Sequence, residues 1–97
     1  MRRDEALRLL TEAGPEIVRR FGVKRLRLFG STARDEARED SDVDVLVEFE
    51  GPATFRGYFD LLHYLEDKFG TTVDLVTEKG LRKEVRPYVE KDAIRVA

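Results

Sequence analysis

Two aspartates, Asp42 and Asp44, are separated by one residue at the start of a hydrophobic segment that continues through Val45 to Val47. Side chains of a β-strand alternate between its two faces, so residues 42 and 44 are expected to point to the same side. Like charges held this close destabilise a fold unless a cation or a hydrogen-bond donor compensates them. The pattern therefore predicts that a cation binds at the beginning of this strand.

Gly30 and Ser31 stand ten residues before the aspartate pair and directly after a segment that ends at Phe29. Glycine allows a sharp turn, and Ser31 is predicted to cap a short helix. The N-terminus of a helix that follows such a turn suits a phosphate group, because free N–H donors and the helix dipole both favour an anion. Mg²⁺ is held by one or two carboxylates together with water and substrate phosphate. These residues together predict a metal–nucleotide site with magnesium as the cofactor.

The surrounding sequence predicts the elements that must hold these residues. Apolar periodicity and turn residues predict helices over residues 4–21, 31–38, 54–69 and 81–91, and strands over residues 23–29, 43–49, 73–76 and 94–96. Gly14-Pro15 predicts a break or kink in the first helix, and Pro87 either interrupts or initiates the last one. Thr54 is predicted to cap the third helix and Gly70 to end it.

Strands that alternate with helices predict an α/β (α+β) fold in which helices flank a small mixed sheet. The chain has 97 residues, no internal repeat and no linker-like stretch. A chain of this length has little room for a second lobe, so we expect a single domain over residues 1–97 rather than a cleft between two domains.

Composition excludes several classes of function. A net charge of −2 gives no basic field for nucleic acid, so no direct nucleic-acid contact is expected. No apolar run is long enough for a membrane span or a signal peptide, which favours the cytoplasm and no membrane partner. The chain has no Cys, so it has neither a disulfide framework nor a thiolate metal site.

The spacing Gly30-Ser31, ten residues, Asp42-Val43-Asp44 resembles the signature of the polymerase-beta-like nucleotidyltransferases. The longer string LFGSTARDEAREDSDVDVLVEF is similar to the minimal nucleotidyltransferases that accompany HEPN-domain toxins as antitoxins in prokaryotic toxin–antitoxin pairs. The resemblance extends over nearly the whole chain, including the VDLVT segment and the AIRV ending. It implies the nucleotidyltransferase (polymerase-beta-like) fold.

The resemblance also implies the roles of the site residues. A third carboxylate from a neighbouring strand would be Asp74, so Asp42, Asp44 and Asp74 are the expected catalytic and metal-binding residues. Gly30 and Ser31 would bind the β and γ phosphates of the nucleotide. The implied reaction moves a nucleoside monophosphate from an NTP, with ATP expected, to a hydroxyl group. The alternatives without a functional role are that Asp74 is a charged residue at a strand edge and that the aspartate pair lies at a solvated junction between a loop and a strand.

The resemblance names a partner as well. The chain is too short to carry a separate acceptor-binding domain, so the acceptor is expected on a HEPN toxin that is modified at a tyrosine hydroxyl and thereby silenced. This antitoxin would be of the type VII kind, and homo- and hetero-oligomers both remain open. The rival hypothesis is a binding module that neutralises the toxin by occlusion, with an idle or regulatory nucleotide site.

Three further residues lie near the signature. Arg34 is expected one turn into the phosphate-facing helix and could bind the nucleotide, or could instead form a solvated salt bridge with Asp35 or another nearby carboxylate. Members of the family usually carry Gly where this chain has Asp35, and a carboxylate there is expected to weaken nucleotide affinity. Asp tolerates a left-handed backbone better than most residues but worse than Gly. Ser41 is predicted to fix the turn before the aspartate pair through its side chain.

Overall fold

The computed structural model describes residues 1–97 as alternating helices and strands. In chain order these are α1 (Arg3–Phe21), β1 (Val23–Phe29), α2 (Gly30–Ala33), β2 (Val43–Phe49), α3 (Phe55–Phe69), β3 (Val73–Thr77), α4 (Arg86–Asp92) and β4 (Ile94–Arg95). The strands form one sheet in the order β3-β2-β1-β4. β2 pairs with β1 antiparallel and with β3 parallel, so the predicted mixed sheet is confirmed.

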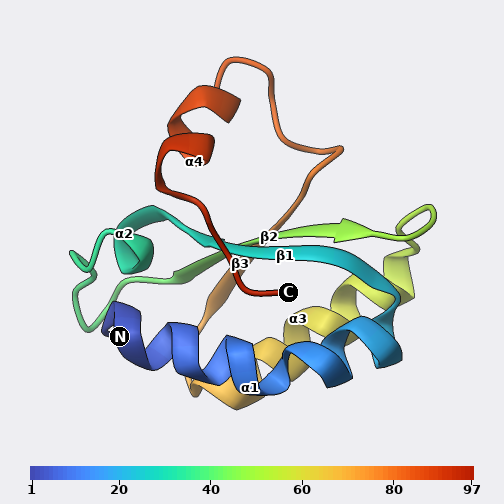
Figure 1. The fold of residues 1–97 in the computed structure, drawn as a ribbon, viewed down its shortest axis with the longest axis horizontal. Coiled ribbons are helices and arrows are strands. Elements are labelled where there is room, and N and C mark those ends of the chain that lie inside the picture. Colours follow the sequence, from blue (N-terminus) through green and yellow to red (C-terminus); the bar gives the residue numbers. More distant parts are fainter.

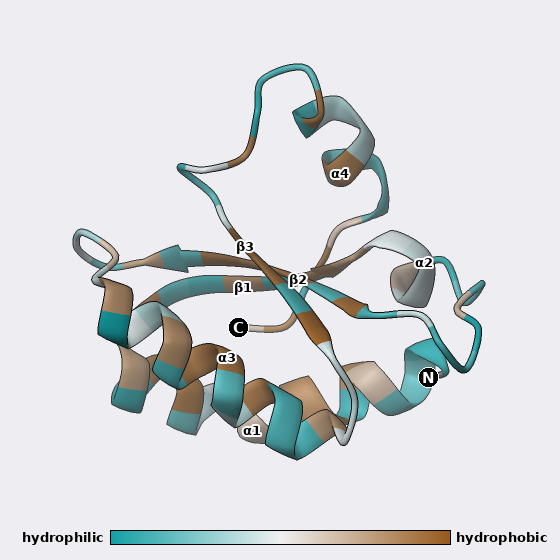
Figure 2. Ribbon diagram, turned by 180° about the vertical axis from the view of Figure 1, so that it is seen from behind, coloured by the Kyte–Doolittle hydropathy of each residue, from teal (hydrophilic) through white to brown (hydrophobic).

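Helices flank this sheet unequally. α1 and α3 lie together on one face, whereas α4 and the loop before it stand on the other (Figure 1). Figure 2 shows that the middle of the sheet carries hydrophobic residues, while the loop between α2 and β2 is hydrophilic. No helix of the structure combines the length and the hydropathy that crossing a membrane requires.

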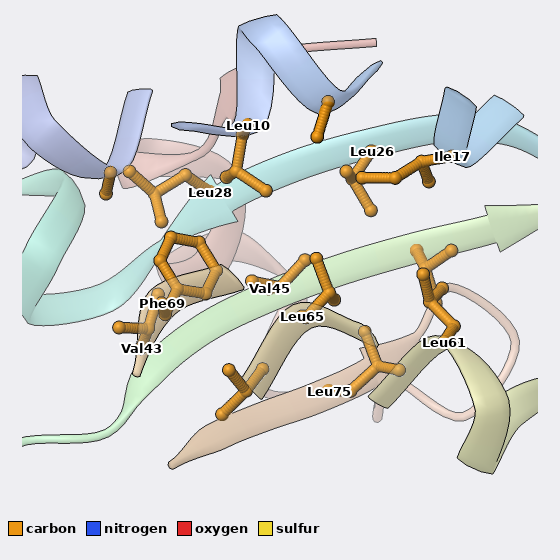
Figure 3. Close-up of a cluster of buried hydrophobic side chains, with 14 of the residues drawn as sticks. Leu10, Ile17, Leu26, Leu28, Val43, Val45, Leu61, Leu65, Phe69 and Leu75 are labelled. Carbon is orange, nitrogen blue, oxygen red and sulfur yellow. The ribbon is translucent and has the colours of Figure 1, made fainter. Parts of the chain in front are cut away.

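The hydrophobic core fills the space between the sheet and the α1–α3 layer (Figure 3). Alternate residues of the three long strands point into this layer, as the period of two predicts. Its fully buried members include Leu10, Ile17, Leu26, Leu28, Val45 and Leu61. The alternating residues that point away from the core, among them Arg27, Asp44 and Asp74, therefore belong to the opposite face of the sheet.

α1 is one continuous helix through Gly14-Pro15, so the break that was one of the two predicted alternatives is absent. Gly14 is buried, and a Cβ built on it would lie 3.5 Å from Val96 O and from Ala97 Cβ. Proline removes only one hydrogen bond from a helix, and burial of one apolar face along the whole length of α1 offsets that loss.

The other long elements match their predicted signals. Thr54 caps α3 by accepting a hydrogen bond from Gly57 N at 2.9 Å, and Gly70 ends the helix at φ 68°. α4 begins at Arg86, later than the predicted residue 81, so that predicted start is wrong. Pro87 lies in its first turn, so the proline initiates the helix rather than interrupting it.

α2 is shorter than predicted and Ser31 does not cap it. The helix covers only residues 30–33, its N-cap is Phe29, and no side chain bonds to its N-terminus. Its early end follows from the backbone of Asp35, which adopts φ 60°. A residue in this left-handed region cannot continue a right-handed helix. The predicted extension to residue 38 is therefore wrong.

Candidate active site

Strand register brings together two of the three predicted carboxylates. Asp44 is paired with Phe29 of β1 on one side and with Asp74 of β3 on the other. Directly paired residues project from the same face of a sheet, so the two aspartates lie side by side on the face opposite α1 and α3. Asp74 is exposed, whereas Asp44 is half-buried. The more accessible carboxylate of the pair is thus Asp74.

Gly30 lies directly against Asp44. It adopts φ +74°, which side chains disfavour, and a Cβ built on it would fall 2.1 Å from Asp44 Oδ2 and 2.9 Å from Asp44 Cγ. Both the turn and the close approach therefore require glycine. Ser31 follows at the same turn, partly exposed, with a hydroxyl that makes no hydrogen bond within the chain.

The surroundings of Asp44 disfavour its ionised form. Its pKa is raised to about 6, first by burial and then by the negative charges of Asp74 and Asp42. The positive charge of Arg34 acts in the opposite direction and lowers this pKa. Asp44 therefore titrates above the range of an ordinary carboxyl, and any bound cation would relieve its repulsion from the neighbouring aspartates.

Asp42 lies just before β2, is exposed, and accepts a hydrogen bond from Thr72 Oγ1. The turn that precedes it is fixed as predicted, because Ser41 Oγ accepts a hydrogen bond from Arg38 N at 3.0 Å. Sequence reasoning did not identify Thr72. The parallel pairing of Val43 with Val73 brings residue 72 beside residue 42, so correct strand pairing would have revealed this contact.

The donor set of this site fits a magnesium ion chemically. Asp42, Asp44 and Asp74 offer only carboxylate oxygens, the ligands that Mg²⁺ prefers, and their mutual repulsion is what a cation would offset. No three acidic or imidazole side chains of the structure are grouped as a ready-made metal cage. This arrangement suits Mg²⁺, which needs one or two protein carboxylates and obtains its other ligands from water and phosphate.

Arg34 follows α2 directly and is already engaged in ion pairs. Its Nη1 donates to Asp92 Oδ2 at 2.7 Å, and its Nε donates to Glu36 Oε2 at 3.2 Å. Asp35 is not among its partners. Arg34 thus forms a salt bridge with Glu36 nearby in the sequence and another with Asp92, which lies 58 residues away and for which sequence spacing gave no signal.

Asp35 directs its carboxylate toward another element. Its Oδ1 accepts a hydrogen bond at 2.9 Å from Arg3 N, the first residue of α1. The left-handed backbone considered from the sequence is present at φ 60°, and Asp tolerates it. The aspartate thus takes the usual place of a family glycine and also satisfies an N–H at the start of α1.

Two further candidates lie outside this cluster. Tyr58 of α3 donates its hydroxyl proton to Leu75 O beneath the sheet, and burial together with the charge of Asp74 raises its pKa. The only histidine, His63, is exposed on α3 beside Phe59. Neither side chain is placed beside Asp44.

Comparisons with known proteins show which family the chain resembles. Residues 12–96 match the family model of the nucleotidyltransferase domain. The chain is 39% identical over 93 residues to protein adenylyltransferase MntA of Thermococcus cleftensis, which covers 96% of this chain and 94% of that protein. A solved structure provisionally named as a minimal nucleotidyltransferase superposes with a TM-score of 0.81 at 44% identity, covering 97% of this chain and 95% of that one.

The fold also matches a chain from a complex. The structure of tri-AMPylated Shewanella oneidensis HEPN toxin with MNT antitoxin gives a TM-score of 0.69 at 17% identity, covering 94% of this chain and 71% of the other. At this identity the likeness concerns the fold alone.

Proposed function

The chain belongs to the nucleotidyltransferase domain family, and from this premise we propose that residues 1–97 act as one domain that moves AMP from ATP to a hydroxyl of a HEPN-domain toxin. The observation that carries the proposal is the juxtaposition of Gly30, directly after β1, with Asp44 of β2 and Asp74 of β3. These three residues occur in a chain that is homologous to protein adenylyltransferase MntA over almost its whole length.

The proposed reaction is a single displacement at phosphorus. The acceptor oxygen forms a bond to the α-phosphorus of ATP, the bond from that phosphorus to the bridging oxygen breaks, and pyrophosphate leaves. The hydroxyl proton passes to Asp74 as general base. The exposure of Asp74 supports this role, because a hydroxyl carried on another protein can reach it.

Asp42, Asp44 and Asp74 would hold Mg²⁺, which when bound neutralises phosphate charge and lowers the pKa of the acceptor hydroxyl. Gly30 and Ser31 would bind the β and γ phosphates through main-chain N–H groups and the free serine hydroxyl. Arg34 would add a charged donor to the same phosphates. These assignments draw support from the closeness of Gly30 to Asp44 and from the field of Arg34 at Asp44.

The partner is proposed from the solved structures that share this fold. HEPN toxins are the partners in complexes that share this fold, one of them in a tri-AMPylated form. A HEPN toxin is therefore the acceptor that we propose here.

The alternative is neutralisation of the toxin by occlusion without transfer. One observation favours it: Arg34 is already ion-paired with Asp92. An idle site would nevertheless gain nothing from holding Asp44 and Asp74 against each other.

Intact-protein mass spectrometry tests the proposal. The purified chain is incubated with the HEPN protein encoded beside it, Mg²⁺ and ATP, and the partner is expected to gain one or more AMP units. A parallel reaction with an ATP analogue that cannot be cleaved between the α and β phosphates should give no gain. A partner that loses its ribonuclease activity while its mass stays unchanged would support occlusion instead.

A further inference from the structure

Asp92 lies where a carboxylate is unfavourable by itself. It is the last residue of α4, and negative charge at the C-terminal end of a helix faces the unpaired carbonyl groups there. Its side chain is only 19% exposed, so water compensates the charge poorly. The hydrogen-bond donor that its side chain finds within the chain is Arg34 Nη1, at 2.7 Å. The position of Asp92 therefore depends on Arg34.

Arg34 in turn is fixed by this contact at one edge of its guanidinium group. Nη1 is bonded to Asp92 and Nε to Glu36, while Nη2 donates no hydrogen bond within the chain. A guanidinium carries five N–H donors in a rigid fork, so two occupied donors orient the group and leave the others available. The two carboxylates bonded to Arg34 differ in exposure: Glu36 is 67% exposed and free to move in solvent, whereas Asp92 is mostly buried.

α4 is itself anchored to the sheet, which makes Asp92 a firm support. Arg27 of β1 is buried and donates to Glu90 of α4 at 2.8 Å, and it also pairs with Glu78 after β3. Arg86 joins the same cluster through Glu78 at 3.1 Å. Hydrogen bonding to Arg27 lowers the pKa of Glu90, so the cluster stays ionised at neutral pH. Val89 of α4 is buried as well.

We infer that Asp92 is a positioning residue that holds Arg34 ready for the phosphates of the nucleotide, with Nη2 as the free donor. This inference rests on the proposed function, because it assigns Arg34 to ATP. An arginine that is ordered before binding loses less side-chain freedom when the ligand arrives. The opposite role, a counter-ion that competes with phosphate for Arg34, would give effects of opposite sign.

Titration of ATP binding in the presence of Mg²⁺ separates the two roles. Asp92→Ala releases Arg34 and is expected to weaken ATP binding by about three- to tenfold, the scale of one immobilised side chain. Asp92→Asn keeps a carbonyl oxygen for Arg34 Nη1 without the charge, and is expected to bind within about twofold of the parent. A competing counter-ion predicts tighter binding in both variants, because both remove the charge.

A double-mutant cycle and a matched control complete the experiment. In the Arg34→Ala background, Asp92→Ala should change ATP affinity by less than about twofold, whereas a general structural defect would persist there. Glu36→Ala, which removes the exposed partner of Arg34, should bind ATP within about twofold of the parent. Melting curves identify any variant that fails to fold, and Asp92→Asn then carries the comparison.

The outcomes separate this inference from the proposed function. A parent that binds ATP while Asp92→Ala binds equally well or more tightly overturns the positioning role alone. A parent that binds no ATP overturns the proposed function, and with it the role of Asp92.

Discussion

Asp44 combines partial burial with two neighbouring carboxylates, and its pKa rises from 3.8 to about 6 as a result. Well below pH 3.8, at about pH 3 and under, the group is protonated in the folded and the unfolded chain, so it has no effect on stability. As the pH rises from about 4 to about 6, the unfolded chain ionises this carboxyl while the folded protein keeps it protonated, so stability falls across that window and stays at the lower level above it. The metal-free site is thus a source of strain at neutral pH.

Asp44→Asn should remove this strain. At pH 7.5 without metal, we expect the variant to be more stable than the parent by about 1 kcal/mol, after allowing for solvent screening of a half-exposed group. At about pH 3, below both pKa values, the two free energies of unfolding should agree. Denaturant melts at both pH values measure the difference. A variant that is markedly less stable at pH 7.5 would show that Asp44 is a structural hydrogen-bond acceptor.

Gly30→Ala tests the close approach of the turn to Asp44. The new methyl group would overlap the Asp44 carboxylate. In addition, the alanine would have to adopt φ +74°, a backbone angle that side chains disfavour. The strain of that backbone and the displaced side chain together should lower the free energy of unfolding by about 1–3 kcal/mol. Gly22→Ala is the matched control, because that residue has a similar φ of +64° but no atom within 4 Å of its Cβ. Equal losses at both positions would mean that contact with Asp44 is unimportant.

Asp74→Ala should separate chemistry from binding. Asp74 is exposed and lies across from Asp44, so its removal leaves Gly30, Ser31 and Arg34 in place. ATP binding is expected within several-fold of the parent, while transfer to the partner slows by about two to four orders of magnitude, as when a positioned base or metal ligand is lost. ATP titration and a time course of the partner's mass give both quantities. Transfer at the parental rate would remove Asp74 from the catalytic residues.

Among the elements, α1 and α2 are coupled through Asp35. The N-cap residue of α1, Arg2, makes no side-chain cap, and Asp35 from the end of α2 supplies the acceptor for Arg3 N instead. The turn that bears Gly30 and Ser31 is therefore tied to the start of the longest helix.

The stability of Asp35 variants should depend both on how well the new residue tolerates the left-handed backbone and on whether it can accept the hydrogen bond from Arg3 N. Asp35→Ala loses the acceptor and strains the left-handed backbone, so we expect a loss of about 1–2 kcal/mol in the free energy of unfolding. Asp35→Gly loses the hydrogen-bond acceptor but adopts the left-handed backbone without strain. Asp35→Asn keeps an acceptor oxygen and tolerates the left-handed backbone. The free energy of unfolding of each variant should therefore stay within about 1 kcal/mol of the parent. Thermal or denaturant melts provide the ranking. If Ala and Asn behaved alike, the hydrogen bond to α1 would contribute nothing.

For the molecule as a whole, ligand binding at the aspartates should increase the stability of the folded chain. A ligand that binds only the folded chain raises its melting temperature, and Mg²⁺ here would also relieve the repulsion around Asp44. We expect Mg²⁺ or Mn²⁺ to raise the melting temperature, and more so with ATP, while Asp42→Asn removes most of that gain. The measurement is a thermal melt with and without each ligand. An unchanged metal response in Asp42→Asn would contradict the assignment of Asp42 to the metal site.

The sequence by itself determined the long elements and the local part of the site. The bounds of β1 and β2, the cap at Thr54 and the stop at Gly70 depend on neighbouring residues, so periodicity and turn chemistry were sufficient to predict them. Gly30 and Asp44 also lie in one short stretch of chain. Their spacing could therefore be read directly, along with the turn that Ser41 fixes.

Only the tertiary structure decided which charges meet. The hydrogen bond from Arg34 to Asp92 spans 58 residues, that from Arg3 to Asp35 spans 32, and that from Thr72 to Asp42 spans 30. Each of these hydrogen bonds depends on strand register or on helix packing. Strand register and helix packing leave no periodic signal in the sequence near the bonded residues. The length of α2 likewise depended on one left-handed residue, Asp35, whose conformation is coupled to a contact with a distant helix. Local sequence sets what a residue can bind, whereas packing of the whole chain sets which partner lies within reach.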